Sequence, residues 1–431
     1  MIENVRRSVL PNGVRIVTEH IETVESVALG IWSVTGSRDE SETQMGISHL
    51  LEHMLFKGTD RRPVPKMIAD EMDAIGGYLN AFTDKEYTCY YARFLGEHLP
   101  IAVDLLADMY AHSRFDSEEL ARERNVVLEE IKGRDDDPED LVHDLFGEAM
   151  HPGHPIGRPV IGTAATVAAI ESPTLREFVA QQYNGRRTIV SAAGNLDHDI
   201  LVAQVEAALG LLPSGDAPAP GVPLPFAPGR HFHSRPTEQV HFCVGTPGFG
   251  HFDRKRYAVA LLDSILGGSM GSRLFQEIRE KRGLAYSIGS YASSHREGGS
   301  FAAYGGTSPE NAEQCVDLVL EEFEKVRRDG VSEAELERAK IQFRVALVMA
   351  QESMSSRMNR LGKSECIHDR VVPLAEMLGE MERVTCEEIQ TIAREILPDG
   401  ETDVAIVAVG PFSAEDLAEI SDDTDGDGGA R

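Results

Sequence analysis

"AVDLLADMYAHSRFDSEELARER" (residues 102–124) and "CVDLVLEEFEKVRRDGVSEAELERAK" (residues 315–340) resemble one another and align at an offset of 213 to 216 residues. Earlier in each half lies an alternating apolar segment typical of a strand, "VALGIWSVTGS" from Val27 and "VHFCVGTPGFG" from Val240. Strands followed by runs of helices, in two similar halves, predict an α+β unit that is built twice.

A proline-rich segment, "PSGDAPAPGVPLPFAP" (residues 213–228), marks the expected domain boundary. Its six prolines resist both helix and central strand and favour an extended spacer. A chain of 431 residues also exceeds the size at which single cores stop growing. We therefore expect an N-terminal domain (1–212), a linker (213–230) and a homologous C-terminal domain (231–418). The acidic, glycine-rich tail, residues 419–431, is expected to be disordered because it has almost nothing to bury.

The chain is strongly acidic. It has 42 Lys and Arg against 71 Asp and Glu, for a net charge of -29. This charge argues against a nucleic-acid partner and against an anionic membrane surface. A basic partner fits better, although an acidic excess is also common as a feature of solubility alone.

The five cysteines lie far apart and include no C-x-x-C pair, so neither a disulfide framework nor a cysteine zinc site is indicated. The first residues lack a continuous apolar segment of the kind found in export signals, and no run reaches 18 apolar residues. These features predict a cytoplasmic protein without a membrane span.

Metal chemistry is suggested by "GISHLLEHMLFKGT" (residues 46–59), where His49 and His53 lie four residues apart and Glu52 directly precedes the second. Residues four apart on a helix share a face, so both imidazoles could point at one cation. The order H-x-x-E-H is the inverzincin pattern, in which we expect the Glu to act as a base. An amphipathic helix with two satisfied histidines is the alternative, and a third ligand would decide between them.

A candidate third ligand lies in "SEELARERNVVLEEIKGR" (residues 117–134), a predicted helix that begins near Ser117. Glu123 and Glu130 are seven residues apart and share a face, whereas Glu129 points about 100° away. A solvated charged face is the ordinary interpretation of such a helix.

These motifs together resemble the pitrilysin family of zinc peptidases, particularly its processing-peptidase branch. In that family H-x-x-E-H is followed, after 76 intervening residues, by a liganding Glu in a helix of the type "ERxVxLxEI", which corresponds to Glu130 in "ERNVVLEEI". The match covers residues 1–415 and includes "GGYLNAFTDKEYTCYY", "HPIGRPVIGT" and "GGSMGSRLF". The resemblance implies two homologous α+β domains, each an antiparallel-rich sheet packed with helices, as in the mitochondrial-processing-peptidase/LuxS-like metallohydrolase fold.

The resemblance also implies roles for individual residues. The ligands of one zinc ion per chain would be His49, His53 and Glu130. Glu129 is the alternative third ligand. Glu52 would be the base that activates water, and Glu123 would support the site from outside the coordination sphere.

The corresponding region of the second half has no H-x-x-E-H. Instead "REKRGLAY" (residues 279–286) places Arg279 and Tyr286 seven residues apart, as in a substrate-contacting segment of the family. The resemblance implies that Tyr286 donates a hydrogen bond to the tetrahedral oxyanion and that Arg279 holds the peptide backbone. Taken alone, the segment would be a basic helix end followed by a packed tyrosine. The nearby loop "GGSMGSRLF" lacks the spacing of a nucleotide-binding motif.

Substrate binding is expected at "GGYLNAFT" (residues 76–83), which in the family is an edge strand that pairs with an extended peptide. Asn80 and Ala81 match the contacting positions, although an ordinary hairpin strand would look the same. Family members of double length enclose a chamber between two halves, and this chain equals one half. The resemblance therefore implies a homodimer in which Arg279 and Tyr286 of one subunit complete the zinc site of the other.

The sequence thus predicts a zinc-dependent endopeptidase that hydrolyses unfolded or presequence-like peptides, with basic peptides favoured by the acidic chain. Two alternatives stay open. One is a non-catalytic structural subunit with the same fold, and the other is a heterodimer with a related chain. The sequence does not distinguish zinc from manganese or cobalt.

Overall fold

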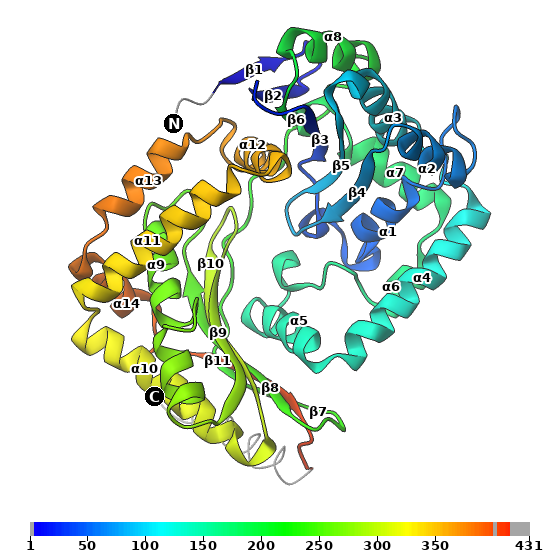
Figure 1. Cartoon of the computed structure of the whole chain (residues 1–431). Coiled ribbons are helices and arrows are strands. Elements are labelled where there is room, and N and C mark those ends of the chain that lie inside the picture. Colours follow the sequence, from blue (N-terminus) through cyan, green and yellow to red (C-terminus); the bar gives the residue numbers. More distant parts are fainter. Residues whose placement is uncertain (1–3, 400–402, 414–431) are drawn as a thin grey trace. The chain divides into compact units, whose positions relative to one another are not determined.

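The structure, a computed structural model, describes residues 4–399 and 403–413, and these form two compact units. The expected disordered tail, residues 419–431, lies outside the described residues. Figure 1 shows the elements of both units in the colours of the sequence. Among the described residues, no helix combines the length and the apolar character needed to cross a membrane.

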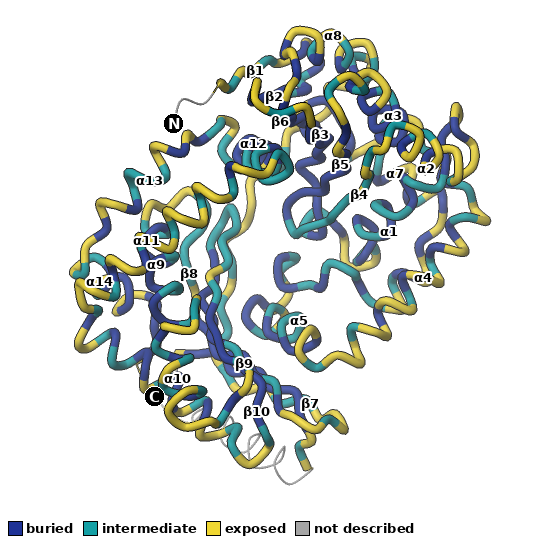
Figure 2. Tube along the Cα trace, in the orientation of Figure 1, coloured by how far each residue is buried: buried dark blue, intermediate teal, exposed yellow. Residues whose placement is uncertain are grey.

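Unit 1 contains a six-stranded sheet with the order β1-β2-β6-β3-β5-β4. Its strands are β1 (Val5–Val9), β2 (Arg15–His20), β3 (Ser26–Ser33), β4 (Tyr78–Thr83), β5 (Thr88–Leu95) and β6 (Thr188–Gly194). Strands β2 and β6 are parallel and the other neighbours are antiparallel. Strand β6 is buried along its whole length, as Figure 2 shows, because helices cover both faces of the sheet.

The helices of unit 1 are α1 (Ile47–Met54), α2 (Pro65–Ala74), α3 (Leu99–His112), most of α4 (Ser117–Asp136), α6 (Ala164–Ala169), α7 (Ser172–Gln182), α8 (His198–Leu209) and α12 (Met354–His368). Successive residues of a strand point to opposite faces, and β3 shows this clearly. Ile31 lies in the core shared with α1 and α3, whereas Trp32 packs against Met358 and Leu361 of α12.

Unit 2 contains a five-stranded sheet with the order β7-β11-β8-β10-β9. Its strands are β7 (Gly229–Ser234), β8 (Val240–Gly248), β9 (Ala285–Ser294), β10 (Gly299–Thr307) and β11 (Ala405–Gly410). Strands β7 and β11 are parallel and the other neighbours antiparallel, so the pairing pattern of unit 1 is repeated. The predicted fold class, α+β with two homologous domains, is confirmed.

The helices of unit 2 are α5 (Pro138–Met150), α9 (Arg256–Leu266), α10 (Ala312–Asp329), most of α11 (Glu333–Ala350), most of α13 (Leu374–Arg383) and α14 (Cys386–Ile396). Strand β8 again divides its side chains between two cores. Phe242 faces the core of α9, α10 and α14, whereas Cys243 faces Phe146 of α5.

Each unit includes a segment from the other half of the sequence. Unit 1 takes its described residues from 1–131, 158–220 and 346–375, and unit 2 takes the remainder. The continuous domains expected at 1–212 and 231–418 therefore differ from the compact units. The reason is that α5 packs on the sheet of unit 2 and α12 packs on the sheet of unit 1.

The end of α2 and the start of β5, on either side of β4, each have a local cause. Helix α2 ends at Ala74 and is followed by Gly76 with a φ of 63°, as expected for a C-cap glycine. Strand β5 begins at Thr88, directly after a turn that is closed by a hydrogen bond from the N–H of Asp84 to the carbonyl of Tyr87.

Candidate metal centre

Helix α1 begins at a buried carboxylate. Glu40 accepts hydrogen bonds from the backbone N–H groups of Gly46 and Ser48, both at 2.8 Å. Gly46 has a φ of 87°, a left-handed conformation that favours glycine. Burial raises the pKa of Glu40 to about 7, although the hydrogen bonds oppose this shift. The helix that carries the H-x-x-E-H motif therefore has a well-defined start.

The two histidines of α1 lie on one side of the helix. Leu50, Leu51 and Met54 are fully buried in the core of unit 1 and fix the rotation of the helix. His49 and His53 are consequently held side by side, with 4.8 Å between their ring centroids.

Glu130 of α4 completes a group of three possible ligands. Its Oε2 atom lies 3.9 Å from Nε2 of His49 and 3.8 Å from Nε2 of His53. One ligand atom of each residue lies within 4.8 Å of the others. Zinc binds His nitrogen and carboxylate oxygen at about 2.0–2.2 Å, so one ion between these atoms would need only a small adjustment of the side chains.

His53 is oriented by a second carboxylate from α4. Its Nδ1 atom lies 3.2 Å from Oε2 of Glu123. Because a carboxylate only accepts, Nδ1–H is the donor, and the lone pair of Nε2 then faces Glu130. The remaining oxygen of Glu123, Oε1, lies 2.7 Å from Nζ of Lys57.

His49 has no such partner within the part of the chain that the structure describes, since its buried Nδ1 atom makes no hydrogen bond there. Burial, followed by the neighbouring His53, lowers the pKa of His49 to about 4. Neutral imidazole is the form that binds a metal ion. The donor set and its protonation thus fit zinc.

Glu52 lies on α1 between the two histidines but outside the group of possible ligands. Thr83, the last residue of β4, donates a hydrogen bond from its hydroxyl to Oε2 of Glu52 at 2.6 Å. Burial raises the pKa of Glu52, and the hydrogen bond from Thr83 opposes this effect. A partly buried carboxylate held in one orientation is suited to accept a proton.

Several predicted residues are brought together and others are not. Glu123 and Glu130 both face α1, as their spacing suggested, whereas Glu129 does not belong to the group. Sequence reasoning missed Lys57 and Thr83. Lys57 lies in the segment with the two histidines (residues 46–59), and Thr83 is the last residue of the predicted substrate strand (residues 76–83). Only the tertiary structure shows which residues they contact.

Asn80 and Ala81 lie in the middle of β4, the last strand of its sheet. Strand β4 pairs with β5 and packs against α1. The side chain of Asn80 donates to the hydroxyl of Tyr78 at 2.8 Å and accepts from the N–H of Ala81 at 2.9 Å. The predicted substrate strand is therefore an edge strand that contacts the helix with the two histidines.

Arg279 and Tyr286 lie in unit 2 and contact one another. Arg279 belongs to a π-helical turn, Phe275–Glu280, a rare feature that is frequent at functional sites. Its guanidinium donates to the carbonyl of Tyr286 at 2.8 Å and lies 4.7 Å from the centre of the tyrosine ring. Tyr286 is 78% exposed, so its hydroxyl is available to another molecule.

Comparisons with known proteins find the same peptidase family in both halves of the chain. The family described as "Insulinase (Peptidase family M16)" matches residues 15–164, and "Peptidase M16 inactive domain" matches residues 169–343. The uncharacterized zinc protease YmxG of Bacillus subtilis is 41% identical over 408 residues, which cover 94% of this chain and 98% of that protein. An uncharacterized zinc protease of Mycobacterium tuberculosis strain H37Rv is 44% identical over 399 residues, which cover 91% of this chain and 90% of that protein.

Two solved structures share the fold. A protease from Helicobacter pylori superposes with a TM-score of 0.89 at 21% identity and covers 95% of this chain and 100% of that chain. A peptidase M16 inactive domain from Pseudomonas fluorescens superposes with a TM-score of 0.87 at 23% identity, and the match covers 95% of this chain and 98% of that chain. At these identities the likeness establishes the fold alone.

Proposed function

The chain belongs to peptidase family M16, the insulinase family, and from this premise we propose that it is a zinc-dependent endopeptidase acting on unfolded peptides. The observation that carries the proposal is the group of His49, His53 and Glu130, whose ligand atoms lie within 4.8 Å of one another beside Glu52. The fit of this donor set to zinc supports one ion per chain.

Different residues of the chain have different roles in hydrolysis. Zinc, when bound, supplies a Lewis acid that polarises the scissile carbonyl and makes water more acidic. Glu52 accepts the proton of the attacking water and delivers it to the leaving amine. Thr83 holds the Glu52 carboxylate by its hydrogen bond of 2.6 Å, so the base does not need to reorient. Glu123 holds the ring of His53 in the orientation that leaves Nε2 available.

The substrate is held by main-chain pairing along β4. An edge strand has an unpaired row of N–H and C=O groups, to which an extended peptide can add as a further strand. This mode demands little of the peptide sequence at Asn80 and Ala81. The net charge of -29 favours peptides with Lys or Arg, including presequence-like segments.

The acting form is a homodimer that encloses a chamber. In this arrangement Tyr286 donates to the developing oxyanion and Arg279 holds the peptide backbone at the zinc site of the partner subunit. The high exposure of Tyr286 supports a role toward another molecule. None of the five cysteines, which all lie in the described part of the chain, belongs to a disulfide bond, which supports a reducing compartment, and we place the enzyme in the cytoplasm on that ground.

Zinc content and peptide cleavage test the proposal together. Glu52→Gln should keep stoichiometric zinc and lose cleavage of an unfolded peptide by at least about a hundredfold. His49→Ala should lose both zinc and cleavage. Glu118→Gln, at an exposed site in the first turn of α4, is the matched control and should change neither. Near-normal cleavage by zinc-loaded Glu52→Gln would refute the role of Glu52, and absence of zinc-dependent cleavage by the unaltered chain would favour a structural subunit.

Mixing two inactive variants tests the dimer. His49→Ala and Tyr286→Phe, combined under conditions that permit subunit exchange, should recover activity, because one zinc site of the mixed dimer has intact ligands and an intact partner tyrosine. An arrangement in which each chain serves its own site predicts no recovery. A mass measurement on the active chain purified alone separates a homodimer from a heterodimer.

A further inference from the structure

Lys57 lies three residues beyond the end of α1 and reaches back to the metal centre. Its Nζ atom is 2.7 Å from Oε1 of Glu123, whose other oxygen is 3.2 Å from Nδ1 of His53. The carboxylate of Glu123 thus bridges an ammonium group and an imidazole. The side chains of Lys57 and Glu123 are 25% and 10% exposed, so this ion pair is far less screened than one on the open surface.

The backbone that follows Lys57 is anchored to the end of α3 and to Arg114, which lies just beyond it. The carbonyl of Gly58 accepts from the N–H of Arg114 at 3.1 Å, and the N–H of Asp60 donates to the carbonyl of His112 at 3.3 Å. The hydroxyl of Thr59 donates to Asp108 at 2.6 Å. The backbone next to Lys57 is therefore held in place, and this fixes the point from which its side chain extends toward Glu123.

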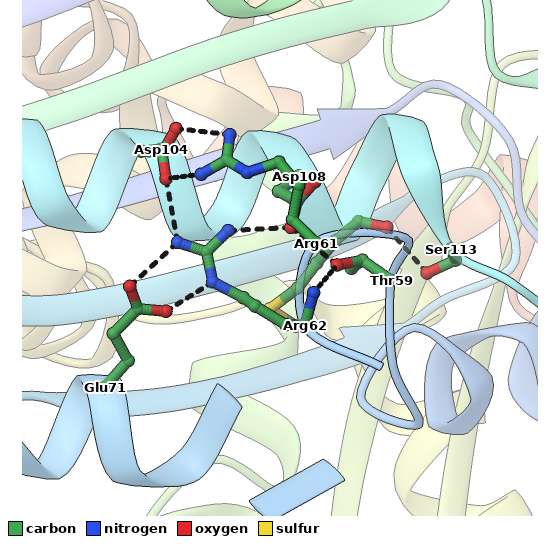
Figure 3. A network of polar contacts seen from close by, with 8 residues as sticks. Thr59, Arg61, Arg62, Glu71, Asp104, Asp108 and Ser113 are labelled. Carbon is green, nitrogen blue, oxygen red and sulfur yellow. Dashed lines mark hydrogen bonds and ion pairs between the residues drawn. The ribbon is translucent and has the colours of Figure 1, made fainter. Parts of the chain in front are cut away.

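Arg62 strengthens this anchor, as Figure 3 shows. Its guanidinium donates to Asp108 at 2.7 Å, to Asp104 at 2.7 Å and to both oxygens of Glu71. The N–H of Arg62 also donates to the Thr59 hydroxyl at 2.8 Å. The loop that follows α1 is consequently held by charged groups from α2 and α3 as well as by its backbone.

The position of Glu123 depends on both of its partners. Without Lys57, a carboxylate that is largely buried would keep only one hydrogen bond, and its Oε1 atom would have no cation beside it. Rotation of the carboxylate toward water would then remove the acceptor from Nδ1 of His53. A histidine that loses this partner is no longer fixed in ring orientation or tautomer.

We propose that Lys57 is a positioning residue of the metal centre, which acts through Glu123 on His53 and thereby sets the affinity of the site for zinc. The proposal rests on the proposed function, because it takes His53 as a zinc ligand. It extends the contacts that support the zinc ligand His53 from Glu123 to Lys57. In this proposal the effect on zinc affinity comes from the charge of the lysine and not from its packing.

Zinc affinity measures this effect without reference to activity. The dissociation constant of the full chain is determined by competition with a chelator at fixed pH. Lys57→Met, which keeps the apolar stem, should weaken zinc binding by about threefold to tenfold. This is less than the tenfold to hundredfold typical of a residue that contacts a ligand directly, because Lys57 acts only through Glu123. Lys57→Arg, which keeps the charge, should restore most of the affinity. Equal losses in Lys57→Met and Lys57→Arg would refute the role of the charge.

Lys66→Met is the matched control. Lys66 forms an ion pair with Asp70 on α2, but the two side chains are 79% and 58% exposed. Its replacement should leave the zinc affinity unchanged. Thermal unfolding of the zinc-free variants shows whether each is folded, and Lys57→Gln replaces Lys57→Met if the latter is not.

A double-mutant cycle tests the path itself. Glu123→Gln alone should weaken zinc binding by about tenfold to a hundredfold. In the Glu123→Gln background, Lys57→Met should have almost no further effect, since its route to His53 is already broken. The same loss from Lys57→Met in both backgrounds, or no loss in either, would overturn the proposal. If the unaltered chain bound no zinc, or if His49→Ala bound it equally well, the proposed function would fail instead.

Discussion

The hydroxyl of Thr83 donates a 2.6 Å hydrogen bond to Glu52 Oε2 and so joins the end of β4 to α1. Strand β4 is the proposed substrate strand, and Glu52 is the proposed base. One contact therefore fixes the base relative to the strand along which a peptide would lie. In the proposed mechanism, this relationship gives Thr83 a role in the chemical step that the H-x-x-E-H motif does not include.

Thr83→Val is expected to lower kcat by roughly tenfold, a part of the hundredfold or more that a positioned base contributes. Valine keeps the β-branched shape and the strand propensity but removes the donor. Zinc content should stay at the level of the unaltered chain, because Thr83 contacts Glu52 and is not among the possible ligands. Thr83→Ser, which keeps the hydroxyl, is the control and should retain most of the activity. Equal kcat values for Thr83→Val and Thr83→Ser would contradict the role of the hydrogen bond.

Arg62 and Arg61 are neighbours in sequence that should differ sharply in their effect on stability. The side chain of Arg62 is 6% exposed and contacts three carboxylates, whereas that of Arg61 is 56% exposed and pairs with Asp104 (Figure 3). Arg62→Met should lower the free energy of unfolding by about 3–5 kcal/mol, because it leaves the buried carboxylate of Asp108 without its cation. Arg61→Met should change it by no more than about 1 kcal/mol. Urea unfolding measures both, and similar losses would contradict the interpretation.

The parts of the site that are local in sequence could be predicted from it. His49 and His53 share a face because they are four residues apart on one helix, and Glu123 and Glu130 share a face because they are seven apart on another. That Glu130 rather than Glu129 meets the histidines followed from a family resemblance and agrees with the geometry. The spacing of residues within a helix thus predicts correctly which side chains share a face in the folded protein.

Contacts between distant segments could not be predicted in the same way. Lys57 and Thr83 have ordinary positions in the sequence, and their partners are set by the packing of α4 and β4 against α1. The exchange of α12 and α5 between the two halves was missed for a related reason. An amphipathic pattern shows that a helix has an apolar face, but it does not specify which of two similar sheets will cover that face.

The contact of α12 with the sheet of unit 1 depends on a glycine. A Cβ atom added at Gly362 would lie 2.2 Å from Cε2 of Trp32, which is fully buried on β3. Gly362→Ala should therefore lower the free energy of unfolding by about 1–3 kcal/mol through overpacking. Gly379→Ala on α13, where a Cβ would meet nothing within 4 Å, should instead raise it by about 0.5–1 kcal/mol. A stabilising effect of Gly362→Ala in urea unfolding would show that α12 does not lie closely on Trp32.

Glu40 should make stability depend on pH. Burial raises the pKa of its carboxyl group from 4.5 to about 7, whereas in the unfolded chain the group titrates near its ordinary value. Between these two pH values the folded state keeps a proton that the unfolded state releases, so the contribution of Glu40 to the free energy of unfolding falls as the pH rises. The fall is about 3 kcal/mol in total and is complete above about pH 7.

Comparison with Glu40→Gln isolates this contribution from that of the other 70 acidic residues, since 71 Asp and Glu are present in total. Gln cannot ionise, and its amide accepts from only one of the two N–H groups at the start of α1, so the variant should be less stable than the unaltered chain at pH 4.5. Its deficit in the free energy of unfolding should shrink as the pH rises toward 7. Urea unfolding at a series of pH values measures the difference, and parallel pH profiles for the two proteins would show that Glu40 ionises as readily in the folded state as in the unfolded chain.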